Sequence, residues 1–468
     1  MLWIYWWNLV GELRPACART RSFLWMALCL AGITIRKDLL GVTSIVRTLG
    51  LAPACYDRLL DFFHSPALNL DKLTRAWCAL VFRYHPAILR VHGRPVLAGD
   101  GIKVAKTGRK MPAVKKLHQQ SESNTKPEYI FGHSCQALAV LVQALSSVFA
   151  LPLTCRIHEG VVFSNRDHRT LLDKMLLLIE SLGLTEPVYF VADAYYASGK
   201  IVRGLLLHGH HLITRVKSNS IAFFPAIPLP PNQRRRRGRP AKYGKKIKVA
   251  ALAKDQDRLQ EVPSPVYGER GVALRFWTTD LLWRPVGILV RFVVVHHPHR
   301  GVILLMCTDL TLQPLDIIRI YGLRFKIEVS FKQALRVLGT YAYHFWMAAM
   351  TRLPRRSGDQ YLHRKSADYR NAVRRKIQAY HRHIQIGLVA QGLLQILSAT
   401  APQQVWRSFG SWIRTIRPGL APSEQVVAIA LRHTFPEFLA NAGKTSILVE
   451  FIRDRLDLSR SEGTSLAA

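Results

Sequence analysis

The chain has 468 residues, of which 66 are Lys or Arg and 30 are Asp or Glu, so its formal net charge at pH 7 is +36. This balance excludes an acidic or neutral metabolic enzyme as the default class, and the 49% content of hydrophobic residues excludes a chain that is disordered throughout. A charge of this size destabilises a compact chain by self-repulsion unless a polyanion screens it. Nucleic acid is therefore the leading candidate partner, and an anionic membrane surface is the rival.

The most apolar stretch of the sequence bears on the membrane alternative. Residues 23–35, FLWMALCLAGITI, form an uncharged run between Arg21 and Arg36. A run this short is more typical of a buried core helix than of a membrane span, which needs about 20 residues. We therefore expect a buried helix, with a membrane element as the alternative.

The seven cysteines are odd in number and form no C-x-x-C pair, which argues against a disulfide framework or a zinc site and favours a reducing cytoplasm.

The first 90 residues have apolar positions at helical spacing and predict a helical N-terminal region. Within it, residues 42–63 (VTSIVRTLGLAPACYDRLLDFF) predict a short helix, a turn at Gly50 and a second helix. This order is typical of a helix-turn-helix, which would make residues 1–90 a DNA-binding region. Two core helices joined by a loop are the alternative.

Residues 91–218 alternate between strand and helix patterns. Apolar runs with β character predict strands at residues 94–100, 135–145, 147–157, 187–193 and 210–218. Two amphipathic stretches predict helices at residues 169–183 and 199–209. The first of these helices has N-cap candidates at Ser164, Asn165 and Asp167. Three strands followed by helix, strand, helix and strand is an α/β order.

The α/β alternation stops after residue 218. Residues 219–312 contain a proline-rich turn, the basic run RRRRGRPAKYGKKIK and three strand-like runs, VALRFWTTDLLW, ILVRFVVVHH and GVILLMCTDL, and they predict a β-rich insertion. Helical sequence resumes over residues 313–350, and a basic helical C-terminal region follows over 351–468. The expected fold class is thus α/β: a mixed sheet with flanking helices, interrupted by a β-rich insertion, between helical N- and C-terminal regions.

Three acidic residues stand out by their positions. Asp100 and Asp193 each end an apolar strand, and Glu328 lies next to the apolar face of an amphipathic helix. A carboxylate in such a place is costly unless it faces a crevice or a cation. Converging carboxylates repel one another unless metal ions neutralise them, and oxygen ligands suit Mg²⁺ or Mn²⁺. Taken singly, each acid has the alternative role of a helix cap, a turn residue or an ion-pair partner.

The segments around these acids give the chain a resemblance to a known family. They are LAGDGIKVAKTGRKMP around Asp100, YFVADAYYASGKIV around Asp193 and YGLRFKIEVSFK around Glu328. In this order, over about residues 94–346, they resemble the catalytic segments of DDE transposases of the insertion-sequence type. The resemblance implies an RNase H-like core that the β-rich insertion interrupts.

The third segment resembles the family's Y-x-x-R-x-x-x-E signature through Tyr321, Arg324 and Glu328. Tyr321 and Arg324 would then lie on the same helix as Glu328 and on the same face of it. A guanidinium and a phenol in these places suit contacts with phosphate. For Tyr321, core packing is the alternative. The family's lysine seven residues after the glutamate is replaced here by Leu335, and Lys332 is the candidate substitute.

The resemblance also implies a mechanism. Asp100, Asp193 and Glu328 would be the metal ligands and would hold two Mg²⁺ or Mn²⁺ ions for an in-line displacement at phosphorus. Water would be the first nucleophile and would free a 3′-hydroxyl at the end of the element, and that hydroxyl would then attack target DNA. Members with this signature resemble enzymes that can pass through a DNA hairpin. By analogy Trp277 or Trp283 is a candidate to stack on a flipped base, with packing between strands as the alternative.

Basic residues outside the signature supply further candidate DNA contacts. Lys103 and Lys332 lie close in sequence to the predicted ligands. Arg237 and Arg239 belong to an RGRP sequence that resembles an AT-hook, whose arginines enter the minor groove of A·T-rich DNA; a loop that binds phosphates without sequence preference is the alternative. Residues 352–376 predict a second surface that follows the DNA backbone. Each account predicts a DNA affinity that falls steeply with salt.

The leading hypothesis is a metal-dependent DNA transposase that cleaves the ends of an insertion sequence and joins them to target DNA. Its expected partners are double-stranded DNA, as terminal inverted repeats and as target, and a second copy of the chain in a synaptic homodimer. No membrane partner is expected, and the expected location is the bacterial cytoplasm, at the nucleoid. The alternatives are a nuclease without strand transfer, a catalytically inactive DNA-binding protein derived from a transposase, and a membrane-associated basic protein.

Overall fold

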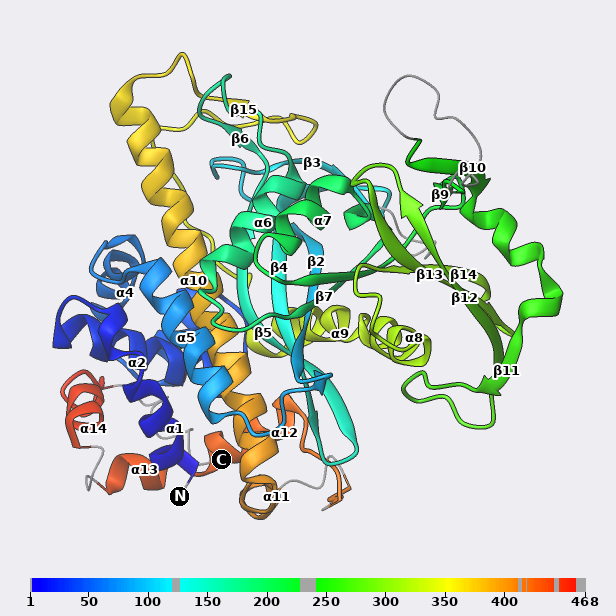
Figure 1. Cartoon of the computed structure of the whole chain (residues 1–468). Helices are drawn as coiled ribbons and strands as arrows, with labels where there is room; N and C mark the ends of the chain where they lie inside the picture. The colour runs from blue at the N-terminus through cyan, green and yellow to red at the C-terminus, as the bar shows by residue number, and fades with distance from the viewer. Residues whose placement is uncertain are drawn as a thin grey trace. The chain divides into compact units, whose positions relative to one another are not determined.

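The computed structural model describes residues 2–119, 127–227, 241–410, 415–417, 419–441 and 446–459. The chain forms two compact units, each assembled from separate stretches of sequence (Figure 1). Unit 1 comprises Met1–Ile88, Asp100–Leu184 and Ile327–Ala468, and unit 2 comprises Leu89–Gly99 and Thr185–Lys326. The domain boundaries predicted from the sequence, after residues 90, 218, 312 and 350, stay a prediction.

Unit 1 is built around the long helix α10 (Ala367–Thr400). Residues 379–398 of this helix are all buried, which is expected of a helix that is covered on every side. Helices α2, α4, α5 and α12 and strand β5 pack on it (Figure 1). The other helices of the unit's terminal regions and core are α1 (Leu2–Gly11), α2 (Thr20–Ile35), α3 (Val42–Thr48), α4 (Cys55–His64), α5 (Leu70–Tyr84), α6 (Leu171–Ser181), α11 (Pro402–Phe409), α12 (Glu424–His433), α13 (Phe435–Ala440) and α14 (Ser446–Arg453).

The N-terminal helices agree with the sequence patterns. Residues 23–35 are all buried as part of α2, so the expected core helix is confirmed. Helices α3 and α4 are the two predicted helices, and Gly50 lies between them with φ of 61°. Their role in DNA binding stays a prediction. In the described residues no single helix is long and apolar enough to span a membrane; only the pair α10 and α11 reaches that length and composition, and the pair is bent by 104°.

Glycines let neighbouring elements approach α10 closely. A Cβ at Gly392 would lie 2.2 Å from Cζ2 of Trp77, and a Cβ at Gly387 would lie 2.8 Å from Oγ1 of Thr340. The indole N–H of Trp77 donates to the main-chain carbonyl of Pro152, on β5, at 2.9 Å. The two glycines therefore make room for a buried tryptophan on one side of α10 and for the backbone near residue 340 on another.

The strands of unit 1 are the second part of β2 (Arg94–Ala105), β3 (Lys115–His118), β4 (Tyr129–Ala144), β5 (Ser147–Ile157), β6 (Val161–Val162) and β15 (Gln360–Tyr361). Strand β4 pairs antiparallel with both β3 and β5. Gly132 on β4 lies against β2, since a Cβ there would be 2.0 Å from the carbonyl oxygen of Val104. Only glycine fits such a close approach of two backbones.

Unit 2 contains the first part of β2 and most of the predicted insertion. Its strands are β1 (Arg90–Val91), β7 (Tyr189–Ala192), β8 (His211–Arg215), β9 (Ile221–Pro225), β10 (Tyr243–Lys248), β11 (Gln260–Pro263), β12 (Ala273–Trp283), β13 (Ile288–His297) and β14 (Gly301–Cys307), and its helices include α7 (Gly199–Leu206) and α8 (Pro314–Leu323). The three long strands β12, β13 and β14 coincide with the runs predicted as strands. They form an antiparallel group that continues into β8.

The strand order confirms the expected fold class. Hydrogen-bonded neighbours follow the order β10-β9-β12-β13-β14-β8-β7-β2-β4-β3, with β5 paired to β4. Strands β2, β7 and β8 are mutually parallel in this order, whereas β4 and β5 are antiparallel. The order β5-β4-β2-β7-β8 is that of an RNase H-like mixed sheet, and the insertion strands extend it beyond β8.

The predicted N-caps of α6 are wrong. The helix begins at Leu171, and Thr170 is its N-cap in a capping box with Asp173, whose carboxylate accepts from the Thr170 N–H at 2.7 Å. Asp167, one of the predicted caps, instead forms a salt bridge with Arg169 at 2.7 Å. The sequence does contain a signal for the true start of the helix, the Thr-x-x-Asp pattern of Thr170 and Asp173. The prediction missed it because it followed the apolar periodicity alone.

Buried histidines predict that the fold is sensitive to acid. His133 and His383 are fully buried in unit 1, and burial lowers the pKa of each to about 3. In the unfolded chain these rings take up protons below about pH 6.5, so their contribution to stability is present above that pH and is lost as the pH falls toward 3. We expect the urea midpoint to decrease between pH 6.5 and pH 4, with about 1.4 kcal/mol per pH unit for each such histidine. A midpoint that stays constant over this range would contradict the burial of neutral rings.

Candidate active site

Asp193 lies at the strand end where the sequence predicted it. Strand β7 is buried along its whole length, and Asp193 follows it directly. Its carboxylate accepts a hydrogen bond from the backbone N–H of Tyr195 at 3.1 Å and caps a short 3₁₀ turn. Its main-chain carbonyl accepts from the hydroxyl of Thr214 on β8, at 2.7 Å. These contacts fix the backbone of Asp193 and leave the residue half-buried at the carboxyl end of the strand.

The residues of the predicted signature in unit 2 lie beside Asp193. Tyr321 is on α8, and Arg324 caps the C-terminus of that helix. The two side chains share a hydrogen bond, and Tyr321 is also within electrostatic range of Arg215 and Asp193. Burial raises the pKa of the Tyr321 phenol; Arg324 and Arg215 oppose this shift and Asp193 reinforces it. The structure therefore brings together a carboxylate, a phenol and two guanidinium groups, which is a suitable setting for a phosphate diester.

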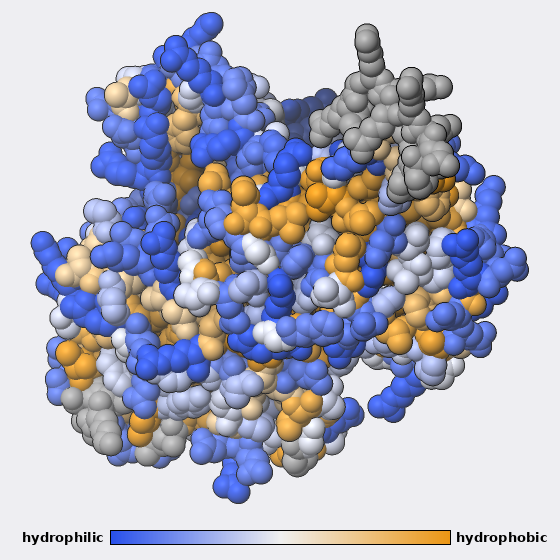
Figure 2. Space-filling view, in the orientation of Figure 1, coloured by the Kyte–Doolittle hydropathy of each residue, from blue (hydrophilic) through white to orange (hydrophobic). Residues whose placement is uncertain are grey.

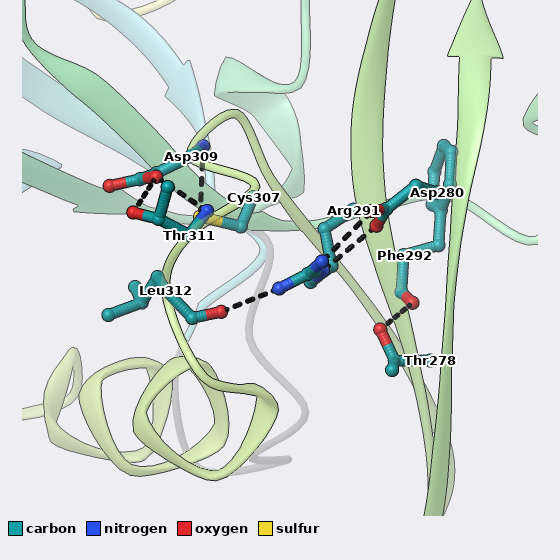
Figure 3. Close-up of polar contacts among 8 residues, drawn as sticks. All are labelled: Thr278, Asp280, Arg291, Phe292, Cys307, Asp309, Thr311 and Leu312. Carbon is teal, nitrogen blue, oxygen red and sulfur yellow. Dashed lines mark hydrogen bonds and ion pairs between the residues drawn. The ribbon is translucent and has the colours of Figure 1, made fainter.

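The connection between β14 and α8 holds this helix in place (Figure 3). Arg291 on β13 donates to both carboxylate oxygens of Asp280 on β12, at 2.8 and 2.9 Å, and to the carbonyl of Leu312 at 3.0 Å. Asp309 accepts from the N–H and the hydroxyl of Thr311, at 2.9 and 2.6 Å. Because Leu312 is two residues before the start of α8, these bonds attach the helix that bears Tyr321 to the strands of the insertion.

Asp309 is a strand-end aspartate that the sequence patterns did not single out. It follows β14 as Asp193 follows β7, but it is buried and accepts a hydrogen bond from the hydroxyl of Tyr189 at 2.7 Å. Although burial raises its pKa, hydrogen bonds from Thr311 and Tyr189 outweigh this and lower the pKa to about 2. Tyr189 is at the opposite end of β7 from Asp193, so Asp309 is a structural carboxylate.

Asp100 lies within a strand and not at its end, so this part of the prediction is wrong. The buried run of β2 stops at Gly99, and from Ile102 onward buried and exposed residues alternate until the strand ends. The apolar pattern thus ended where one face of the strand became exposed, while the strand itself continued. Asp100 is half-buried at this transition. Lys103 is exposed on the same strand, and its ammonium donates to the carbonyl of His118 on β3, at 2.6 Å.

Glu328 is not on the same helix as Tyr321 and Arg324, which corrects a second prediction. Helix α8 ends before Arg324, and a new helix, α9 (Lys326–Gln333), bears Glu328 in its first turn. Glu328 and Lys332 are both exposed on α9. The helix continues as a π-helical turn, Ala334–Leu338, which contains the exposed Leu335. Whether Lys332 takes the place of the family's lysine stays a prediction.

The shared metal site stays a prediction. Asp100 and Glu328 belong to unit 1, and Asp193 belongs to unit 2. Within the part of the chain that the structure describes, no group of three or more His, Cys, Asp or Glu side chains is arranged to hold a metal ion. The chemistry of the donor set fits the implied metal, because three carboxylates are hard oxygen ligands of the kind that Mg²⁺ and Mn²⁺ prefer.

Two further sequence predictions concern DNA contacts. Arg237 and Arg239 lie outside the described residues. Trp277 and Trp283 are both buried, and the indole N–H of Trp277 donates to the carbonyl of Leu252 at 3.1 Å. Both rings are therefore packed within unit 2, as the alternative predicted, and stacking of either ring on a flipped base stays a prediction.

The basic surface predicted at residues 352–376 consists of β15, the loops beside it and the first turns of α10 in unit 1. Figure 2 shows mainly hydrophilic side chains over this end of α10. Arg374 lies over the ring of Phe163, 4.6 Å from its centre. Its exposed cations are Arg352, Arg355, Arg356, Arg364, Lys365, Arg374 and Arg375. A surface of this composition suits a phosphate backbone, and its contact with DNA stays a prediction.

Comparison with known proteins places the chain in a family. The model of a family described as DDE superfamily endonuclease matches residues 13–274, which is more than half of the chain and includes Asp100 and Asp193. Among solved structures, a similar one is the cryo-EM structure of a piggyBac transposase synaptic complex with hairpin DNA, with 11% identity, a TM-score of 0.37, and coverage of 97% of this chain and 84% of that chain. No curated protein matches the chain in sequence. The chain belongs to the DDE superfamily endonucleases, as the order and surroundings of its acidic residues predicted.

Proposed function

We propose that this protein is a DNA transposase that hydrolyses a phosphodiester at each end of an insertion sequence and transfers the freed 3′ ends to target DNA. The observation that carries the proposal is the half-buried Asp193 at the end of β7, beside Tyr321 and Arg324, in a chain of the DDE endonuclease family. The net charge of +36 supports a polyanionic substrate. The proposed partners are terminal inverted repeats, target DNA and a second copy of the chain.

Asp100, Asp193 and Glu328 are the residues that would hold Mg²⁺ or Mn²⁺. When bound to carboxylates, such ions activate an attacking oxygen and neutralise charge on the phosphate. The protein's own contribution is to supply three carboxylates from three different elements, β2, the end of β7 and α9. Asp193 is fixed in position by its bonds to Tyr195 and Thr214 before any ligand is bound.

Arg324, Arg215 and Tyr321 would bind and orient the phosphate. A guanidinium binds phosphate oxygens through two parallel N–H groups, so it fixes the orientation of the diester as well as its position. Tyr321 stays protonated at neutral pH because burial raises the pKa of its phenol, so its hydroxyl is available to donate a hydrogen bond. The two arginines also concentrate DNA near Asp193 through their charge.

Product analysis tests the proposed function. Purified protein would be incubated with Mg²⁺, a labelled duplex that ends in the terminal repeat flanking its gene, and a supercoiled target plasmid. We expect 3′ nicks at the repeat end and labelled DNA joined to the plasmid. Nicks without joined DNA would support a nuclease that lacks strand transfer. Binding of the repeat without any cleavage would support the inactive DNA-binding protein, which the replacement of the family's lysine by Leu335 favours.

A further inference from the structure

Buried side chains hold the segment that follows Glu328 by hydrogen bonds to its main-chain carbonyls. Residues 338–345, which we name the strap, lie directly after the π-helical turn that continues α9. Four buried side chains of unit 1, from three different parts of the sequence, donate hydrogen bonds to main-chain carbonyls of the strap. The donors are Arg36 to Leu338 and Gly339, His383 to Thr340, Lys106 to Tyr341 and Tyr343, and Tyr380 to Phe345.

Arg36 forms hydrogen bonds with the start of the strap. Its side chain is 3% exposed, and its Nε donates to the carbonyl of Leu338 at 3.0 Å. Its Nη2 donates to the carbonyls of Gly339, at 2.9 Å, and of Leu338, and its Nη1 donates to the carbonyl of Gly41 at 3.0 Å. Leu338 and Gly339 end the helical stretch that begins with α9, so the guanidinium meets the negative end of a helix dipole.

Gly339 is needed for this contact on two grounds. Its backbone is left-handed, with φ of 59° and ψ of 34°, a conformation that favours glycine. A Cβ at this position would also lie 2.6 Å from Nη2 of Arg36. The pairing of Arg36 with Gly339 therefore depends on both residues, although about 300 positions separate them in the sequence.

Lys106 links the strap to the strand that bears Asp100. It is the residue directly after β2, and its side chain is 5% exposed. The ammonium donates to the carbonyls of Tyr341 and, at 3.1 Å, of Tyr343, and it lies 3.6 Å from the centre of the Tyr343 ring. The end of β2 and the end of the helical stretch that bears Glu328 are thus attached to the same short strap.

Two neutral side chains of α10 also bind this part of the chain, one on α9 and one in the strap. Gln391 donates to both the carbonyl and the hydroxyl oxygen of Ser330, each at 3.1 Å, only two residues after Glu328. His383 lies 3.0 Å from the carbonyl of Thr340 through Nδ1. The contacts at Ser330 hold α9 close to Glu328, and the contacts of the strap hold the C-terminal end of the helical stretch that begins with α9.

The two buried cations are unusual because neither forms a salt bridge with a carboxylate in the described part of the chain. A buried charge without a counter-ion is costly, and an apolar residue of similar size is commonly as stable at such a site. Here main-chain carbonyls compensate each charge: three of the four hydrogen bonds of Arg36 and both hydrogen bonds of Lys106 go to the strap. We propose that Arg36 and Lys106 are positioning residues that set where Glu328 stands relative to Asp100, by fixing the strap. The proposal rests on the proposed function, since it assigns these residues to the alignment of two of its metal ligands.

Arg36→Met tests the proposal, with Arg382→Met as the matched control. Arg382 is also buried and donates to two main-chain carbonyls, those of Leu68 and Phe63 at 3.0 and 3.1 Å, neither of which belongs to the strap. Single-turnover cleavage would be measured at saturating DNA and Mg²⁺. We expect the rate of Arg36→Met to fall by about 10²-fold, because a small displacement of a catalytic group has an effect of this order. DNA affinity should stay within about twofold, and Arg382→Met should cleave within about threefold of wild type.

Two additional measurements separate positioning from general damage. Arg36→Lys, which keeps a charge and a donor, should recover part of the rate, and amides 334–345 should exchange hydrogen faster in Arg36→Met than in Arg382→Met. If Arg36→Met does not fold, Lys106→Met gives the same comparison, with an expected rate loss of at least about tenfold. A folded Arg36→Met or Lys106→Met that cleaves as fast as Arg382→Met would overturn the proposal. If the wild-type protein itself cleaves no repeat DNA, the proposed function fails first and this inference falls with it.

Discussion

Asp193→Asn is expected to abolish strand cleavage while the affinity for DNA stays within about twofold of the wild-type value. Asparagine has the size of aspartate and retains an oxygen that can accept from the Tyr195 N–H, so the turn after β7 should be preserved. It lacks the negative charge that a divalent cation requires. We expect the cleavage rate to fall by at least about 10³-fold, which corresponds to about 4 kcal/mol of activation free energy. Cleavage of a labelled terminal-repeat duplex and binding of the same duplex would be measured side by side.

Asp309→Asn is the matched control for this experiment. It makes the same change at another strand end of unit 2, where the carboxylate is bound by Tyr189 and Thr311. This variant should lose stability, because its buried hydrogen bonds favour the ionised form, and should retain cleavage at temperatures where it is folded. Cleavage by Asp193→Asn at more than about a tenth of the wild-type rate would refute the role assigned to Asp193.

Arg324→Ala is expected to lower the cleavage rate by about tenfold to a hundredfold, the range for loss of a hydrogen bond to a charged group. The guanidinium lies with Tyr321 near Asp193, where it would hold a phosphate through two N–H groups. Arg324→Lys should recover only part of the rate, since an ammonium cannot make the bidentate contact. The rate would be measured at saturating DNA, so that weaker binding alone does not account for the loss.

Arg300→Ala controls for the removal of one positive charge. Arg300 is in unit 2, pairs with Glu269 at 2.8 Å and is not one of the signature residues. Its loss should change the cleavage rate by less than about twofold, because the Arg300 side chain is 55% exposed and an ion pair of an exposed side chain contributes little. Equal losses for Arg324→Ala and Arg300→Ala would mean that Arg324 acts only through overall charge.

The sequence predicted the elements whose signal is local. The apolar run at residues 23–35 is the buried helix α2, and the three long runs of the insertion are β12, β13 and β14. The end of β7 could be located because a strand that is buried on both faces gives an unbroken apolar run, and this run stops at the carboxylate of Asp193.

Predictions failed where one pattern could arise from two structures. At Asp100 the apolar run stopped because one face of β2 became exposed, which the sequence does not distinguish from the end of a strand. The break between α8 and α9, at Arg324 and Phe325, falls inside an amphipathic pattern and contains no Gly or Pro. Asp309 has the same strand-end signal as Asp193, and only its contact with Tyr189 reveals a structural role.

Contacts between distant parts of the chain could not be predicted at all. Arg36 reads as the polar end of an apolar helix, and nothing near it in the sequence indicates that its guanidinium binds the carbonyl of Leu338. Lys106 similarly reads as one more cation in a basic segment, although its ammonium is buried against Tyr343. These pairings depend on the fold as a whole, and no local periodicity encodes them.

The most direct test of the central claim is to count Mn²⁺ ions bound to the protein in complex with terminal-repeat DNA. Electron paramagnetic resonance of free Mn²⁺ gives the number and affinity of bound ions in the wild type and in Asp100→Asn, Asp193→Asn and Glu328→Gln. We expect about two ions per chain in the wild type and a lower affinity or number in each of the three variants. Full wild-type binding of Mn²⁺ by any one of these variants would show that its carboxylate is not a ligand, and would contradict the account of three acids that act together.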